Sequence, residues 1–115
     1  MRRAARFIPA LLWASLIFLL SSQPRLPDLP LTFDGVDKAA HALFFGILCA
    51  WVVFGFGHRG RPALVAGIVA TSLYGGFDEV HQMFVPGRSP DILDWVADTA
   101  GAALAATAIR FWRLR

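Results

Sequence analysis

Residues 74–101 have the sequence YGGFDEVHQMFVPGRSPDILDWVADTAG. Most of the ionisable groups that are not arginines flanking apolar runs fall in this stretch, and apolar segments surround it. Ionisable groups within or beside membrane segments are energetically costly, which makes them candidates for function. The stretch therefore predicts where a polar site lies and which helices carry it.

The rest of the chain is strongly apolar. Of its 115 residues, 57% are hydrophobic and 17% are charged, whereas a typical soluble domain has about 25% charged residues. The apolar residues come in long runs and not in amphipathic stripes, which indicates an integral membrane protein with one small bundle. The arginines sit at the ends of these runs, so we expect no nucleic-acid partner. The single Cys49 allows no internal disulfide.

Four membrane spans are predicted, at about residues 6–22, 37–57, 62–83 and 90–112. The expected fold is an all-α, four-helix membrane bundle that forms one domain over residues 1–115. A proline-rich linker over residues 21–35 separates the first two spans, because proline lacks the amide donor that a helix needs. Ser89 is expected to cap the fourth helix. A cleaved signal peptide is the alternative interpretation of the first span.

The charges sort the loops onto two sides. An even number of spans places both termini and the turn at residues 58–62 on one side, which then holds eight of the eleven basic residues. By the positive-inside rule this side is cytoplasmic. All eight acidic residues fall on or near the opposite, outer side. The start of the second span, the end of the third and the start of the fourth should therefore meet at the outer face.

Three aspartates of the fourth span share one helix face. Asp91, Asp94 and Asp98 are spaced i, i+3 and i+7, which places Asp98 about 10 Å deeper than Asp91. Asp98 should face the bundle interior and be either protonated or paired with Lys38 or Arg88.

Several ordered motifs resemble those of the VanZ-like membrane proteins. They are Asp37-Lys38-x-x-His41-x-x-Phe44, Asp78-Glu79-x-x-Gln82-x-Phe84-x-Pro86-Gly87-Arg88, Asp94-x-x-x-Asp98-x-x-Gly101, and Ser21-Ser22-Gln23-Pro24 after the first span. The family pattern usually has Asn at the position of Asp98. The resemblance implies a small multi-pass protein of the bacterial cytoplasmic membrane, in a family whose name member is associated with teicoplanin resistance. It implies no settled biochemical activity.

The polar residues suggest a site that binds, or binds and modifies, an anionic envelope lipid or lipid-linked wall precursor at the outer face. The candidate acid–base residues are His41, Asp78, Glu79 and Asp94, and the candidate ligand-binding residues are Asp37, Lys38, Gln82, Arg88 and Asp98. In this hypothesis Lys38 and Arg88 hold the anion.

The sequence does not decide whether the protein is an enzyme, whether it uses a cofactor or how it oligomerises. A metal site could draw on His41, Asp78, Glu79, His81 and Asp94, because carboxylate and imidazole groups suit divalent ions, but no compact motif such as HExxH is present and we predict no metal. The main alternative is a structural or accessory protein whose charges serve packing or partner binding, and transport is a third class.

Overall fold

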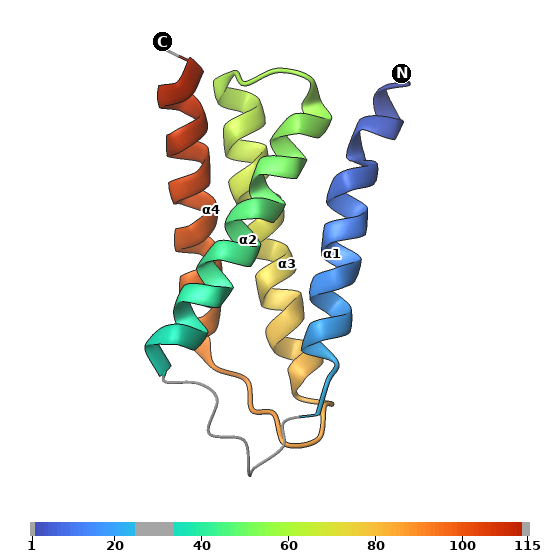
Figure 1. The fold of residues 1–115 in the computed structure, drawn as a ribbon, viewed down its shortest axis with the longest axis vertical. Helices are drawn as coiled ribbons and strands as arrows, with labels where there is room; N and C mark the ends of the chain where they lie inside the picture. Colours follow the sequence, from blue (N-terminus) through green and yellow to red (C-terminus); the bar gives the residue numbers. More distant parts are fainter. Residues whose placement is uncertain (1, 25–33, 114–115) are drawn as a thin grey trace.

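The structure, a computed structural model, describes residues 2–24 and 34–113. Within these ranges the chain is helical and contains no strand. A short 3-10 helix, η1 (Arg3–Phe7), leads into α1 (Ile8–Ser21), and α2 (Asp34–Phe56), α3 (Arg61–Gln82) and α4 (Ile92–Arg113) follow. The helices stand side by side along the long axis of the molecule (Figure 1). Most of the proline-rich linker, with Pro27, Pro30 and Asp28, lies outside the described residues.

In the part of the chain that the structure describes, four helical segments are long and apolar enough to cross a membrane. They cover Arg3–Ser21, Asp37–Phe56, Arg61–Gln82 and Ile92–Trp112. Large apolar side chains such as Leu11, Leu73 and Leu104 stay exposed on the outside of the bundle, as expected where lipid and not water surrounds the helices. The predicted all-α, four-helix fold of a membrane protein is thereby confirmed.

The two ends of the bundle differ in the segments they contain. The start of η1, the turn between α2 and α3 and the end of α4 lie together at the top of Figure 1, and we call this the terminal end (residues 2–7, 57–61 and 109–113). The loop end (residues 21–24, 34–41 and 78–98) lies at the bottom. The chain therefore places its three described basic clusters at one end and its described acidic residues at the other.

The helix boundaries follow from local chemistry. Gly57 ends α2 with φ of +75° and Gly87 has the same φ in the turn after α3, a conformation that glycine adopts without steric cost. The expected cap at Ser89 is wrong: α4 begins at Ile92, and the Asp91 carboxylate accepts the hydrogen bond from the Leu93 amide at 2.9 Å. Aspartate caps as well as serine does, and Asp91 is the residue directly before the helix.

Glycine lets α2 and α4 approach closely, and this contact positions the polar site. A Cβ added at Gly101 would collide with the backbone of Ala42, and one at Gly46 would lie 3.0 Å from the carbonyl oxygen of Gly101. Such small residues allow helix backbones to come together in membrane bundles. As a result, the first turns of α2 face the first turns of α4.

Aromatic side chains attach α1 to the rest of the bundle. The indole Nε1 of Trp13 donates to the carbonyl oxygen of Phe44 at 2.8 Å, and the hydroxyl of Tyr74 donates to that of Ala14 at 2.6 Å. Ile17 packs in the same core cluster as Phe45. These contacts set α1 against α2 and α3 above the loop end.

Candidate functional site

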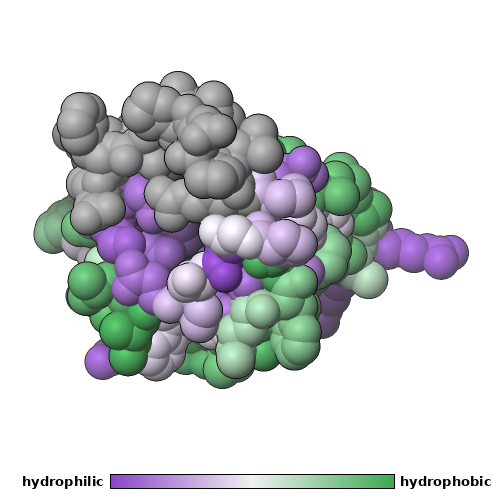
Figure 2. All heavy atoms as spheres, turned by 90° about the horizontal axis from the view of Figure 1, so that it is seen from below, coloured by the Kyte–Doolittle hydropathy of each residue, from purple (hydrophilic) through white to green (hydrophobic). Residues whose placement is uncertain are grey.

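The buried polar groups of the bundle concentrate at the loop end. They include Ser21, Asp78, Glu79, Gln82, Asp94 and Asp98. Figure 2 views the molecule from the loop end: hydrophilic residues gather near the middle of this face, and hydrophobic residues form much of its margin. The polar groups thus belong to the interior of the bundle, as their cost in lipid requires.

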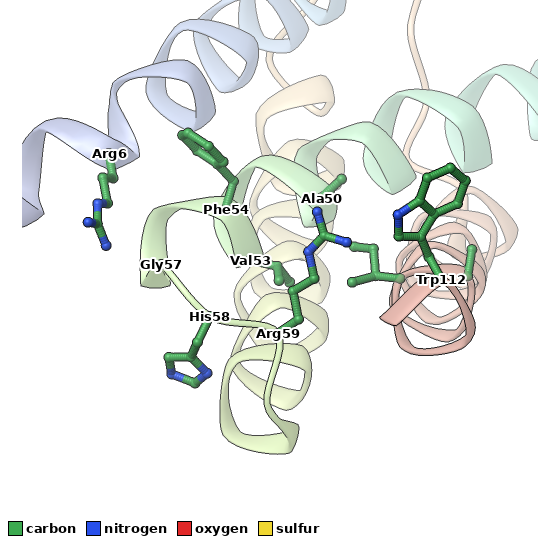
Figure 3. A pocket seen from close by; sticks show the side chains of 10 residues that line it. Arg6, Ala50, Val53, Phe54, Gly57, His58, Arg59 and Trp112 are labelled. Atoms are coloured by element: carbon green, nitrogen blue, oxygen red, sulfur yellow. The ribbon is translucent and has the colours of Figure 1, made fainter. Parts of the chain in front are cut away.

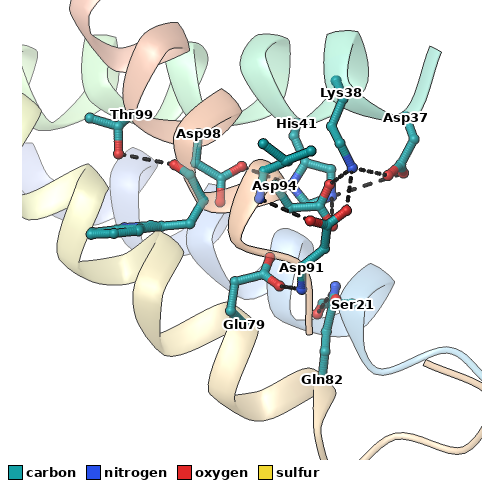
Figure 4. Close-up of polar contacts among 12 residues, drawn as sticks. Ser21, Asp37, Lys38, His41, Glu79, Gln82, Asp91, Asp94, Asp98 and Thr99 are labelled. Carbon is teal, nitrogen blue, oxygen red and sulfur yellow. Dashed lines mark hydrogen bonds and ion pairs between the residues drawn. The ribbon is translucent and has the colours of Figure 1, made fainter. Parts of the chain in front are cut away.

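Lys38 on α2 lies among three carboxylates. Its Nζ is 2.8 Å from Asp91 Oδ2, 2.5 Å from Asp94 Oδ1 and 3.6 Å from Asp37 Oδ2. The Lys38 ammonium and the Leu93 amide both donate to Asp91, and they lower the pKa of its carboxyl. Lys38 therefore ties α2 to the first turn of α4 (Figure 4).

His41 lies one turn deeper on the same helix and pairs with Asp98. Its Nδ1 is 2.7 Å from Asp98 Oδ1, and its Nε2 is 3.7 Å from Asp94 Oδ2. The ring of Phe45 lies parallel to the imidazole, with centroids 6.1 Å apart. The expectation that Asp98 pairs with Lys38 or Arg88 is wrong, because Lys38 is used one turn nearer the loop end and Arg88 bonds to α1.

Glu79 connects α3 to the start of α4. Its Oε2 accepts a hydrogen bond from the Asp91 amide at 2.8 Å. Its other oxygen, Oε1, has no hydrogen-bond partner among the described residues, and neither has Asp98 Oδ2. Both atoms are buried. Each has lost its hydrogen bonds to water, and no group in the described structure replaces them.

A pocket of about 170 Å³ opens between α1, α2 and α3 at the loop end. We call it the loop-end pocket. Its polar lining residues are Ser21, Asp37, His41, Asp78, Gln82 and Arg88, and its apolar lining residues are Ile17, Leu20, Ala40, Phe44 and Phe45. It therefore offers one basic group, several acceptors and a hydrophobic wall to the same bound molecule.

The α1 side of this pocket is held by hydrogen bonds from α3 and the following turn. Gln82 Nε2 donates to Ser21 Oγ at 3.2 Å, and Arg88 donates from Nε to the Gln23 carbonyl oxygen at 3.0 Å. A neighbouring contact joins Ser22 Oγ and His81 Nε2 at 2.8 Å. The role of Ser21 as a pocket residue was missed from the sequence, although the Ser21-Ser22-Gln23-Pro24 motif was the available signal.

All nine residues proposed from the sequence lie at the loop end, in two overlapping groups. The carboxylate network consists of Asp37, Lys38, His41, Glu79, Asp91, Asp94 and Asp98. The loop-end pocket takes Asp78, Gln82 and Arg88, together with Asp37 and His41. Lys38 does not line that pocket. Of the two proposed anion-binding residues, Arg88 therefore lies at the pocket, whereas Lys38 lies among the carboxylates of the network.

Among the described residues, two triplets could hold a metal ion, and each has its potential ligand atoms within 4.8 Å of one another. One is Asp37, His41 and Asp94, and the other is His41, Glu79 and Asp98. Imidazole and carboxylate are ordinary ligands for divalent ions.

A second and larger hollow, about 930 Å³, lies at the terminal end. Apolar residues such as Val53, Phe54 and Trp112 line it, with Arg6 and Arg59 also contributing (Figure 3). None of its lining residues is acidic. It lacks the mixed acid and base groups of the loop-end pocket, which therefore remains the candidate site.

Comparison with known proteins identifies the chain at the level of its family. A family model described as VanZ/LLP1 matches residues 6–113, a range that includes all four helices and every residue of the site. Searches of curated proteins and of solved structures found no match. The resemblance expected from the motifs is confirmed, and the chain belongs to the VanZ/LLP1 family.

Proposed function

We propose that the loop-end pocket binds a phosphate-bearing headgroup of an envelope lipid or lipid-linked wall precursor, and that this binding supports tolerance to the glycopeptide teicoplanin. The observation that carries the proposal is the pocket itself, in which Arg88, two carboxylates and a hydrophobic wall converge at one end of a membrane bundle. The protein would then lie in the bacterial cytoplasmic membrane, with this end at the outer leaflet.

Arg88 is the basic group of this pocket. Its Nε and Nη2 atoms donate to the carbonyl oxygens of Gln23 and Leu20, at 3.0 and 3.4 Å. A guanidinium has five N–H donors, so these two bonds leave donors that can hold phosphate oxygens in a forked geometry. Lys38 is surrounded by carboxylates, which supports Arg88 as the principal anion-binding residue.

The acidic side of the pocket suits a headgroup that also carries hydroxyl or amino groups. Asp37 and Asp78 can accept hydrogen bonds from such groups, and Gln82 can both donate and accept. A phosphate alone would be repelled by these carboxylates, whereas a sugar phosphate or an amino-alcohol phosphate complements both sides. The preferred ligand is therefore a polar phosphate ester and not a free phosphate ion.

The volume of the pocket limits how much of a ligand it can enclose. A water molecule occupies about 30 Å³ in the liquid, so about 170 Å³ holds only a few polar groups. Drug-sized ligands usually fill pockets of about 300 Å³ or more. The pocket would thus take the headgroup, while the lipid tail stays along exposed apolar side chains such as Leu20.

Chemical modification of the headgroup is an extension of the same proposal. His41 and Asp78 both line the pocket, so a proton donor and a proton acceptor could meet one bound ligand. Binding alone requires neither residue to change its protonation state. A loss of turnover without loss of binding in Asp78→Asn would distinguish the two forms.

A structural role is the second candidate, and Lys38 is the observation that favours it. One ammonium contacts three carboxylates, from α2, from α4 and from the residue directly before α4, an arrangement that fixes helix ends without any ligand. In this alternative, changes at Arg88 would lower the melting temperature and the teicoplanin tolerance together. In the binding proposal, Arg88→Lys would reduce tolerance while the protein still accumulates and melts as wild type does.

Native mass spectrometry of the gently solubilised chain tests the proposal directly. We expect a retained phosphate-bearing lipid in the wild type, which Arg88→Gln loses and the matched control Arg110→Gln, at the opposite end, keeps. The ligand mass separates a phospholipid from a polyprenyl-linked wall precursor. A wild-type protein without bound lipid, under conditions that preserve other lipid complexes, would contradict the proposal and support the structural role.

A further inference from the structure

The loop end buries more negative than positive charge. Asp78, Glu79, Asp94 and Asp98 are only 3%, 8%, 6% and 0% exposed. Lys38, which three carboxylates already share, contacts Asp94, and His41 contacts Asp98, while Arg88 lines the same pocket as Asp78. Carboxylates removed from water are costly unless a cation or hydrogen bonds compensate them, so the described side chains leave part of this charge unbalanced.

Two buried carboxylate oxygens at the centre of this region have no partner in the described chain. They are Glu79 Oε1 and Asp98 Oδ2. In Figure 4 the free oxygens of the two carboxylates point toward one another across the space between α3 and α4. Asp98 Oδ2 also lies against α3, since a Cβ added at Gly75, one turn before Glu79, would come within 2.8 Å of it. Two facing carboxylate oxygens repel one another unless a proton or a cation lies between them.

From these observations we propose that His41, Glu79 and Asp98 form a binding site for a divalent first-row transition ion such as Mn²⁺ or Zn²⁺. Each residue comes from a different helix, α2, α3 and α4, and their ligand atoms lie within 4.8 Å of one another. One imidazole nitrogen with two carboxylate oxygens is a donor set that suits these ions better than Mg²⁺ or Ca²⁺, which prefer oxygen alone.

The existing contacts orient the three ligands. The Asp91 amide holds Glu79 through Oε2 and leaves Oε1 for the ion. His41 Nδ1 and Asp98 Oδ1 are 2.7 Å apart and share a proton, which must leave when Nδ1 binds the ion. Asp98 can then ligate through Oδ2, the oxygen that has no partner among the described residues. Asp94 Oδ2, 3.7 Å from His41 Nε2, can then stabilise the orientation of the ring.

This site goes beyond the headgroup proposal and does not depend on it. Of the three ligands, only His41 also lines the loop-end pocket. An ion can be added and measured without any lipid. A failure of metal binding would leave the mass-spectrometric result on the lipid unchanged, and the converse also holds.

Manganese binding to the full chain, purified without a histidine tag and stripped with EDTA, tests the inference. We expect one Mn²⁺ per chain after equilibrium dialysis, and electron spin-echo modulation from one coordinated histidine nitrogen. Asp98→Asn and Glu79→Gln should each weaken binding by about tenfold or more, and His41→Gln should remove the nitrogen signal. Excess Zn²⁺ should displace the Mn²⁺.

His58→Gln is the matched control, because this histidine lies in the turn between α2 and α3 at the terminal end and belongs to neither triplet. It should bind Mn²⁺ as the wild type does. Absence of stoichiometric binding to the wild type would overturn the inference without recourse to any variant. Binding that survives Asp98→Asn, Glu79→Gln and His41→Gln would also overturn it, since the ion would then sit elsewhere, for example at His58 or His81.

Discussion

At the scale of single residues, Lys38 is the best test of how the carboxylate network supports the fold. Lys38→Met keeps an unbranched side chain but leaves the buried Asp94 without its closest cation. Removing one partner of a buried ion pair is strongly destabilising, so we expect the melting temperature in detergent to fall by about 5–10 °C. Circular dichroism during heating measures this change.

Asp37→Asn is the control for Lys38→Met. The Asp37 side chain is 41% exposed and its oxygen is 3.6 Å from the Lys38 ammonium. Exposed ion pairs contribute little, so this variant should melt close to the wild type. Equal shifts in the two variants would show that the network responds to total charge at the loop end and not to the short Lys38–Asp94 contact.

The sequence predicts which polar residues gather at the loop end, but not which of them pair. The i, i+3, i+7 spacing of Asp91, Asp94 and Asp98 places all three on one face, as the structure shows from their contacts with α2. Pairing depends on the axial register of α2 against α4, which no spacing within one helix contains. The observed partner of Asp98 is His41, which lies one helical turn after the expected partner Lys38 on α2.

At the scale of helices, that register rests on glycine. The Cβ of alanine at Gly101 would collide with the Ala42 backbone, and backbone cannot move aside as a flexible side chain does. Gly101→Ala should therefore force α2 and α4 apart, lower the melting temperature by about 10 °C or prevent accumulation in the membrane, and weaken the Lys38–Asp94 contact. Immunoblots of membranes and thermal melts measure these effects.

Gly76→Ala provides the comparison for Gly101→Ala. Its added Cβ would meet only the Trp95 Nε1 at 3.7 Å, an ordinary contact distance. Alanine also favours helix over glycine by about 1 kcal/mol, so this variant should be as stable as the wild type or more so. If Gly101→Ala behaved in the same way, the close approach of α2 and α4 could not be what fixes the register.

At the scale of the whole molecule, the four spans and the grouping of their connections follow from hydropathy and charge. Long apolar runs and proline-glycine turns are visible in the sequence, and they predict the helical bundle that the structure contains. The loop-end pocket was not predictable in shape, because it depends on how α1 leans on α2 and α3 through Trp13 and Tyr74. Those contacts join residues far apart in the chain.

The orientation in the membrane stays a prediction that cysteine labelling can test. The native Cys49 is fully buried, and Cys49→Ala gives a background for single cysteines at exposed positions. Ser89→Cys at the loop end should react with a membrane-impermeant maleimide in intact cells, whereas His58→Cys at the terminal end should react only after permeabilisation. The reverse pattern would place the pocket in the cytoplasm and exclude an outer-leaflet ligand.

Small apolar side chains fill the bundle between the loop end and the terminal end. Cys49, Val53, Ala102 and Ala106 form one buried cluster there, together with Ala63 and Leu64. A headgroup or ion that binds at the loop end, as we propose, would meet this apolar cluster on its way towards the terminal end and would be released from the side at which it entered. On that proposal the site would be open to one side of the membrane only, and its ligand would be recognised there without passing through the bundle.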